Sequence, residues 1–191
     1  MVLKINNLSK SFADRVILDN FSYSFSENGI YLITGESGIG KTTLLRIIAG
    51  LDKDFVGEIE NGGFENVSFM FQEYRLFPTL NAVKNAASSY GKLKYSEAEE
   101  MLTRLGFKAD DLTKKPRELS GGMKQRVSFV RAMLKDSPII LLDEPTKELD
   151  PHTADIMLDI IREESERRLI IAVTHDDISE KLGNAQTIHL Q

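Results

Sequence analysis

The 191-residue sequence is long enough for one domain with a single hydrophobic core. Its 41% apolar and 28% charged residues are close to globular averages and exclude disordered and collagen-like classes. The net charge of −5 argues against a general nucleic-acid binder, and the absence of cysteine excludes disulfides and zinc–thiolate sites.

The first part of the chain predicts strands around one helix. The run at 30–34 is apolar at every position, which is typical of a central strand buried on both faces. Aromatic residues at 21, 23 and 25 alternate with serines, which indicates a half-buried strand. The predicted elements of this part are strands over 2–5, 21–25, 30–34 and 67–71 and a helix over 43–49.

Residues 78–119 change character, with helical patches, the clearest at 96–105, separated by Gly and Pro. We interpret them as a small helical subdomain inserted into one domain over residues 1–191. Helices and strands then alternate strictly, which favours a parallel α/β sheet with crossovers. The predicted elements are helices over 123–135 and 151–166 and strands over 139–143, 169–174 and 187–190.

Neither a leader nor a membrane span is predicted. Residues 1–7 lack the apolar stretch of a signal peptide. The densest apolar runs, 139–142 and 169–173, are far shorter than the roughly 20 residues that cross a bilayer. We expect a soluble protein that meets a membrane only through a partner.

A glycine-rich stretch after the strand at 30–34 has the spacing of a phosphate-binding loop. Gly35 is followed by four residues and then by Gly40, Lys41 and Thr42. The glycines allow backbone amides to turn toward an anion, and the helix that follows adds its dipole. In this motif Lys41 would reach the β- and γ-phosphates and the Thr42 hydroxyl would ligate Mg²⁺.

Two carboxylates, Asp143 and Glu144, follow the apolar run at 139–142. At the carboxyl edge of a parallel sheet they would lie beside the phosphate loop. We expect Asp143 to hold Mg²⁺ and Glu144 to orient or deprotonate the attacking water. His175 ends the next strand and is expected to face the γ-phosphate in a catalytic or sensing role, with a structural role as the alternative.

The stretch Leu119-Ser120-Gly121-Gly122 resembles the signature motif of the ABC transporter ATPases, and the other motifs follow that family's order. Gln72 resembles its Q-loop glutamine, residues 147–150 its D-loop and His175 its H-loop. Phe12 stands where the family has an aromatic residue that stacks on adenine. The resemblance implies nucleotide contacts from Phe12, Gly35, Glu36, Ser37, Gly38, Ile39, Gly40, Lys41, Thr42, Thr43, Ser120, Gly121, Gly122 and Asp150. It further implies catalytic roles for Lys41, Gln72, Glu144 and His175 and a Mg²⁺ site formed by Thr42, Gln72 and Asp143.

The resemblance also implies a fold and a function. The fold is that of a P-loop NTPase with a mostly parallel sheet, a small antiparallel subdomain and a helical insert. ATP would lie between two head-to-tail copies, or between this chain and a sister subunit. The chain resembles most the nitrate, sulfonate and taurine importers. This resemblance implies permease subunits in the membrane and a substrate-binding protein outside it as partners, and no nucleic acid. It also implies that the chain itself lies in the cytoplasm, peripheral on the inner face of the cell membrane.

The sequence departs from the family pattern at a few positions. Met123 replaces the usual Gln, and Lys147 and Glu148 replace Ser and Ala. The segment 57–69 is short, so we expect a trimmed antiparallel subdomain and modest nucleotide affinity. We also expect no regulatory domain after Gln191.

Other functions stay open at this point. The main alternative is a soluble ABC-type ATPase that acts on a cytosolic complex, and a second is a regulatory module without turnover. An exposed apolar groove around residues 72–80 would favour the transporter, since a purely soluble protein should not leave one open. Kinases and GTPases are disfavoured because the signature motif would have no task in them.

Overall fold

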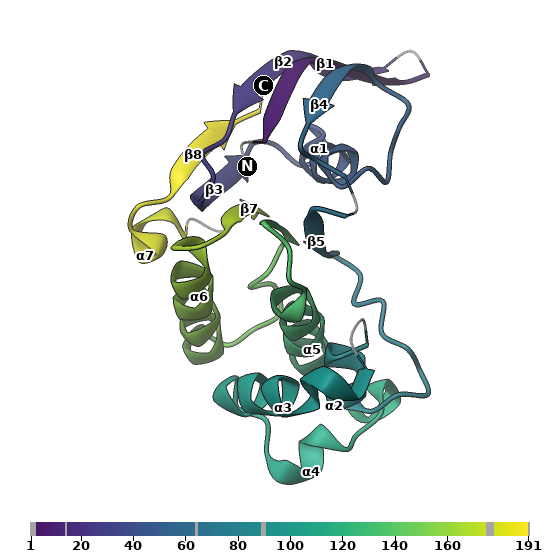
Figure 1. Ribbon diagram of the computed structural model, residues 1–191, viewed down its shortest axis with the longest axis vertical. Coiled ribbons are helices and arrows are strands. Elements are labelled where there is room, and N and C mark those ends of the chain that lie inside the picture. The colour runs from purple at the N-terminus through teal and green to yellow at the C-terminus, as the bar shows by residue number, and fades with distance from the viewer. Residues whose placement is uncertain (1–2, 14, 64, 89–90, 175–177, 191) are drawn as a thin grey trace.

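The computed structural model describes residues 3–13, 15–63, 65–88, 91–174 and 178–190, which form two β-sheets with helices around them (Figure 1). The larger sheet is parallel, with the strand order β5-β6-β7-β3-β8. Its strands are β3 (Gly29–Thr34), β5 (Val67–Met70), β6 (Ile139–Asp143), β7 (Leu169–Val173) and β8 (Gln186–His189).

The central strands of this sheet are buried on both faces, as their continuous apolar runs predict. Successive residues of β6 alternate between two hydrophobic cores. Ile140 and Leu142 belong to one core, and Ile139 and Leu141 belong to the other. The predicted parallel α/β sheet is therefore confirmed, and all carboxyl ends of its strands lie along one edge.

A second, antiparallel sheet has the order β2-β1-β4 and lies at one end of the molecule (Figure 1). Its strands are β1 (Lys4–Phe12), β2 (Arg15–Ser24) and β4 (Val56–Glu60). The predicted strand at 2–5 was too short, and β4 was not predicted. Most of β1 and β4 is polar or half-exposed, so their pairing with each other, rather than an apolar pattern, defines them.

The helices pack on opposite faces of the parallel sheet. Helix α1 (Lys41–Ile48) shares one core with the antiparallel sheet, while α5 (Gly121–Leu134) and α6 (Pro151–Ser165) contribute to the other. Helices α2 and α3 pack against α5 at the end of the molecule remote from the antiparallel sheet (Figure 1). The remaining helical segments are α2 (Ala82–Ala86), η1 (Gly91–Lys94), α3 (Tyr95–Arg104), α4 (Ala109–Leu112), η2 (Pro116–Glu118) and α7 (Ser179–Leu182).

Two helices begin earlier than the sequence pattern predicted, and both differences involve motif residues. Helix α1 begins at Lys41 rather than at residue 43, directly after Gly40. Helix α5 begins at Gly121 rather than at residue 123, because the Ser120 hydroxyl caps it and accepts a hydrogen bond from the Met123 amide. Helix periodicity starts only with the first apolar residue and therefore misses first turns made of polar residues, as in α1, or of glycines, as in α5. Within the described ranges, none of the helices has the length and apolar character that spanning a bilayer would need.

Candidate functional site

The predicted phosphate loop connects the carboxyl end of β3 to the first turn of α1. Its conformation needs glycine at the loop's last position, where Gly40 has a φ of 115°. A methyl group at Gly40 would lie 2.5 Å from Cγ2 of Ile17, a residue of β2. The antiparallel sheet thus packs directly against the loop, a contact between distant segments that sequence reasoning missed.

The Lys41 side chain folds over this loop. Its Nζ atom donates hydrogen bonds to the carbonyl oxygens of Gly35, at 2.8 Å, and of Glu36, at 2.9 Å. The residue is only 5% exposed although it carries a charge. The loop therefore surrounds a buried lysine side chain, and lysine is a residue type suited to contact a phosphate anion.

Asp143 ends β6 next to the first turn of α1. It is 2% exposed, and burial is the main cause that raises the pKa of its carboxyl group. A hydrogen bond from the Thr42 side chain and the nearby charge of Lys41 act in the opposite direction and lower this pKa. A hydroxyl and a carboxylate in contact are the oxygen donors that Mg²⁺ prefers, so these two residues fit that cation.

Glu144 follows in a backbone conformation that is uncommon for this residue type, with a φ of 54°. Its amide donates to the Val173 carbonyl at 2.8 Å, and its own carbonyl accepts from Gln125 Nε2 at 2.7 Å. Two neighbouring elements, β7 and α5, therefore fix the turn after β6. Gln125 was not predicted as a site residue, and a polar side chain on the buried face of a helix was the one signal for it.

A cavity of about 380 Å³ joins these groups. Ile17 and Val173, which were not predicted, also line it. Exposed Phe12, at the end of β1, and Gln72, after β5, complete its walls. The predicted residues that line this cavity are Phe12, Ser37, Gly38, Gly40, Lys41, Thr42, Thr43, Gln72, Asp143 and Glu144.

Other predicted residues lie elsewhere. Gly35, Glu36 and Ile39 belong to the loop but do not line the cavity. Ser120, Gly121 and Gly122 form the start of α5, and they too are absent from its walls. His175 lies outside the described residues.

Asp150 also lies away from the cavity and caps α6. It accepts hydrogen bonds from the Thr153 amide, at 3.0 Å, and from the Thr153 hydroxyl, at 2.7 Å. These bonds hold the pKa of its carboxyl group below the usual value.

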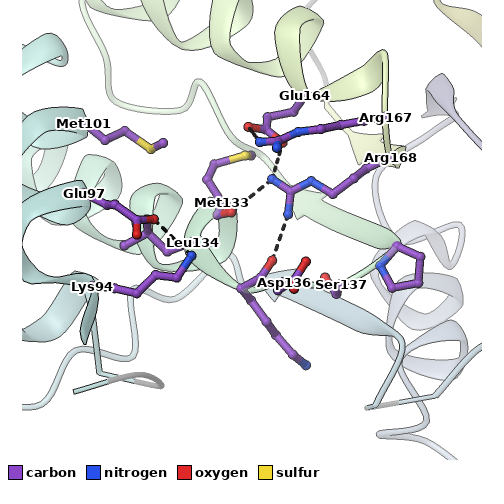
Figure 2. A pocket seen from close by; sticks show the side chains of 12 residues that line it. Lys94, Glu97, Met101, Met133, Leu134, Asp136, Ser137, Glu164, Arg167 and Arg168 are labelled. Atoms are coloured by element: carbon purple, nitrogen blue, oxygen red, sulfur yellow. Dashed lines mark hydrogen bonds and ion pairs between the residues drawn. The ribbon is translucent and has the colours of Figure 1, made fainter. Parts of the chain in front are cut away.

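A larger cavity, of about 590 Å³, lies between α3 and the carboxyl-terminal ends of α5 and α6 (Figure 2). Charged side chains line it, and they pair with one another. Lys94 lies 3.0 Å from Glu97, while Glu164 bonds Arg167 and Arg168. Among the described residues, none that belongs to a motif identified in the sequence lines this cavity, so the phosphate-loop cavity is the candidate functional site.

The fold and the site together define a P-loop ATPase, with a phosphate loop between β3 and α1 and a buried carboxylate at the end of β6, which β7 separates from β3 in the same sheet. The sequence profile of the ABC transporter family matches residues 18–147. The chain therefore belongs to the ABC transporter family. It is an ATPase that binds ATP together with Mg²⁺, as the resemblance in the sequence implied.

Individual relatives agree with this assignment. The aliphatic sulfonates import ATP-binding protein SsuB of Bacillus subtilis is 37% identical over 98% of this chain and 80% of its own length. The macrolide export ATP-binding/permease protein MacB of Mannheimia succiniciproducens is 36% identical over 92% of this chain but only 31% of its own. A dimeric, post-hydrolysis structure of the ATP-binding cassette MJ0796 bound to ADP and Pi superimposes with a TM-score of 0.86. It is 29% identical, covering 99% of this chain and 94% of that one.

Proposed function

We propose that this chain is the ATP-hydrolysing, energy-coupling subunit of an ABC importer, peripheral on the inner face of the cell membrane. Its partners would be integral membrane permease subunits, a second ATPase subunit and, through the complex, an extracytoplasmic substrate-binding protein. In this proposal residues 1–191 form one ABC ATPase domain, and residues 78–119 act as its helical subdomain. The similarity to SsuB favours import and a sulfonate-like cargo.

One observation carries the transporter proposal: an apolar groove of about 310 Å³ beside Gln72. Phe77 is 53% exposed on its wall, and Phe69 and Phe71 stack with ring centres 4.3 Å apart. The Arg75 guanidinium lies 3.7 Å above the Phe71 ring. Exposed apolar side chains, here Phe77 and Leu51, beside stacked aromatic rings are typical of a binding surface for another protein.

The occupant proposed for the groove is a short helix of a permease subunit. Apolar side chains of such a helix would bury Phe77 and Leu51, and the basic side chains of Arg75 and Arg131 would face an acidic residue on it. Residues on both sides of Gln72, among them Phe71 and Arg75, line the groove, and Gln72 itself lines the ATP cavity. A change at the nucleotide would therefore reach the permease through one short segment.

Replacing Phe77 by Asp is expected to abolish association with the membrane subunits, because a charge would be buried in the apolar interface. The measurement is co-purification of tagged protein from detergent-solubilised native membranes, read by mass spectrometry. The unchanged protein should capture a polytopic membrane protein in stoichiometric amounts, and Phe77→Asp should lose it. Lys84→Ala, on the exposed face of α2, is the matched control and should retain it. Capture of soluble proteins alone would favour the cytosolic ATPase instead.

Within the ATP site we assign roles by position. Lys41 and the loop amides would hold the phosphates, while Thr42, Asp143 and Gln72 would hold Mg²⁺, which neutralises phosphate charge when bound. Phe12 would stack on the adenine, and Glu144 would orient or deprotonate the attacking water, with His175 near the γ-phosphate. These roles rest on the cavity that most of these residues share and on the family resemblance.

The site of a single copy is incomplete in this proposal. The residues at the start of α5 do not line the cavity that contains the phosphate loop of the same chain. A helix N-terminus is a favourable place for a phosphate, so Ser120, Gly121 and Gly122 would contact the ATP bound by a second copy. Asp150 would lie at the same interface. Two head-to-tail copies would then enclose two ATP molecules.

Replacing Asp143 by Asn is expected to stabilise the protein without nucleotide and to weaken its stabilisation by Mg²⁺-ATP. Since burial raises the pKa of Asp143, the folded state binds its proton more tightly than the unfolded state does. As pH rises from 3.8, the ordinary pKa of an Asp carboxyl, through the raised pKa of Asp143, ionisation of this carboxyl lowers the free energy of unfolding. Asn does not ionise, so the variant does not lose this stability. Urea unfolding with EDTA, at pH 7 and at pH 4, measures the gain in the free energy of unfolding without nucleotide. The same experiment with Mg²⁺-ATP measures how much stabilisation by the nucleotide is lost. A variant less stable than the parent in EDTA at pH 7 would contradict this prediction.

A further inference from the structure

Two side chains connect the segment after Gln72 to the turn that precedes α6. The Tyr74 hydroxyl donates a hydrogen bond of 2.6 Å to Oε2 of Glu148. Burial, with the neighbouring Glu148 carboxylate adding to it, raises the pKa of Tyr74 to about 12. The phenol therefore stays protonated and remains a donor at neutral pH.

Tyr74 is fixed to α5 by its backbone. One guanidinium nitrogen of Arg131, on α5, donates to the Tyr74 carbonyl at 2.8 Å, and the other donates to the Arg75 carbonyl at 2.7 Å. The tyrosine is thus held by the same helix whose first residues are the signature glycines. It has a defined position from which to orient Glu148.

Glu148 lies against those glycines. Its backbone has a φ of 63°, uncommon for Glu, which brings its carbonyl oxygen within 3.0 Å of where a methyl group on Gly122 would be. A methyl group on Gly121 would overlap the Glu148 carboxylate and would lie 3.3 Å from the Tyr74 hydroxyl oxygen. Only glycine leaves room for this carboxylate at the start of α5.

A carboxylate in this place affects how an anion can approach. Helix α5 has 14 residues, and the amides of its first turn carry partial positive charge that attracts anions. Under the proposed function, the γ-phosphate of the second copy's ATP arrives at Ser120, Gly121 and Gly122. The Glu148 carboxylate would both repel that phosphate and occupy part of its space.

We propose that Glu148, held by Tyr74, is an autoinhibitory latch over the signature residues, and that it must move aside before two ATP-loaded copies can pair. This inference rests on the proposed head-to-tail dimer and deepens it, because it assigns the regulation of that site to two side chains. The latch raises the ATP concentration at which pairing occurs. It does not change how one copy binds ATP through its own loop.

The test measures the ATP concentration for half-maximal dimerisation of variants built on Glu144→Gln, with light scattering after size-exclusion chromatography. Glu148→Ala and Glu148→Gln are expected to lower this concentration by about three- to tenfold, because each removes the charge near the helix N-terminus. Tyr74→Phe keeps the ring but releases the carboxylate, so a smaller decrease is expected. Glu99→Ala, on the exposed face of α3, makes the same change of net charge and should have no effect.

Two further readouts separate a latch from a structural role. Calorimetric ATP affinity of the monomeric forms should be the same for all variants. With Glu144 intact, the Glu148 variants should lower KM for ATP while kcat changes less than about twofold. A variant that merely perturbs folding would instead lower the unfolding temperature and reduce kcat.

The outcomes distinguish this inference from the proposed function. If the Glu144→Gln parent dimerises and the Glu148 variants leave the midpoint unchanged or raise it, the latch is wrong and the dimer stands. If the parent stays monomeric but its Glu148→Ala form dimerises, the latch is supported in its strongest form. If neither form dimerises at saturating Mg²⁺-ATP, the head-to-tail dimer fails and the latch fails with it.

Discussion

Replacing Glu144 by Gln is expected to slow ATP hydrolysis by about 10²- to 10⁴-fold, the usual contribution of a positioned general base. The substitution keeps the size of the side chain and both backbone hydrogen bonds, from the Glu144 amide to Val173 and from Gln125 to the Glu144 carbonyl. ATP binding should therefore persist. Because the site can assemble but cannot turn over, the variant should accumulate as an ATP-dependent dimer.

The dimer is measured by light scattering with and without saturating Mg²⁺-ATP, alongside phosphate release under the same conditions. Glu99→Gln, the same substitution on the exposed face of α3, is the control and should hydrolyse ATP at the parent rate. A Glu144→Gln protein that remains monomeric with ATP would contradict pairing between copies of this chain. Unchanged phosphate release would contradict the assignment of Glu144 as the base.

Replacing Lys41 by Ala is expected to weaken ATP binding by roughly 100-fold or more, because it would remove charged hydrogen bonds to both the β- and the γ-phosphate. Each such bond contributes about 1.5–3 kcal/mol, and about 1.4 kcal/mol is tenfold in affinity. The variant loses the buried ammonium group of the loop. It also leaves the carbonyls of Gly35 and Glu36, which accept from Lys41 Nζ, without that donor. Both changes lower the affinity of the loop for a phosphate, because it loses a positive charge and gains carbonyl oxygens without a donor.

Isothermal titration calorimetry with ATP measures this loss, and thermal unfolding checks that the variant folds. Lys84→Ala removes the same charge from an exposed position on α2 and should bind ATP like the parent. An unchanged affinity in a folded Lys41→Ala protein would overturn the role of Lys41. The two variants should therefore separate two steps. Lys41→Ala should lose ATP binding, whereas Glu144→Gln should bind ATP but not hydrolyse it.

Local patterns made much of this protein predictable. The phosphate loop lies within eight consecutive residues, and its glycines can be recognised by their spacing because the backbone conformation of the loop requires them. The buried strands β3, β6 and β7 are short apolar runs whose burial on both faces requires such composition. With a carboxylate pair at the end of the apolar run of β6, the parallel sheet and the place of Asp143 beside the loop followed. The order of the motifs along the chain further indicated the ABC transporter family.

The tertiary structure decided what depends on contacts between distant segments. Strand β4 exists because it pairs with β1, and Ile17 reaches the loop because β2 packs over Gly40. Gln125 supports Glu144 across 19 residues of sequence, and Tyr74 meets Glu148 across 74. No periodicity or propensity records such pairs, since each partner alone is an ordinary polar residue. The sequence thus determined the local chemistry of the ATP site. Only the contacts of α5 with the turn after β6 and with the segment after Gln72 decided which side chains support or restrain that site.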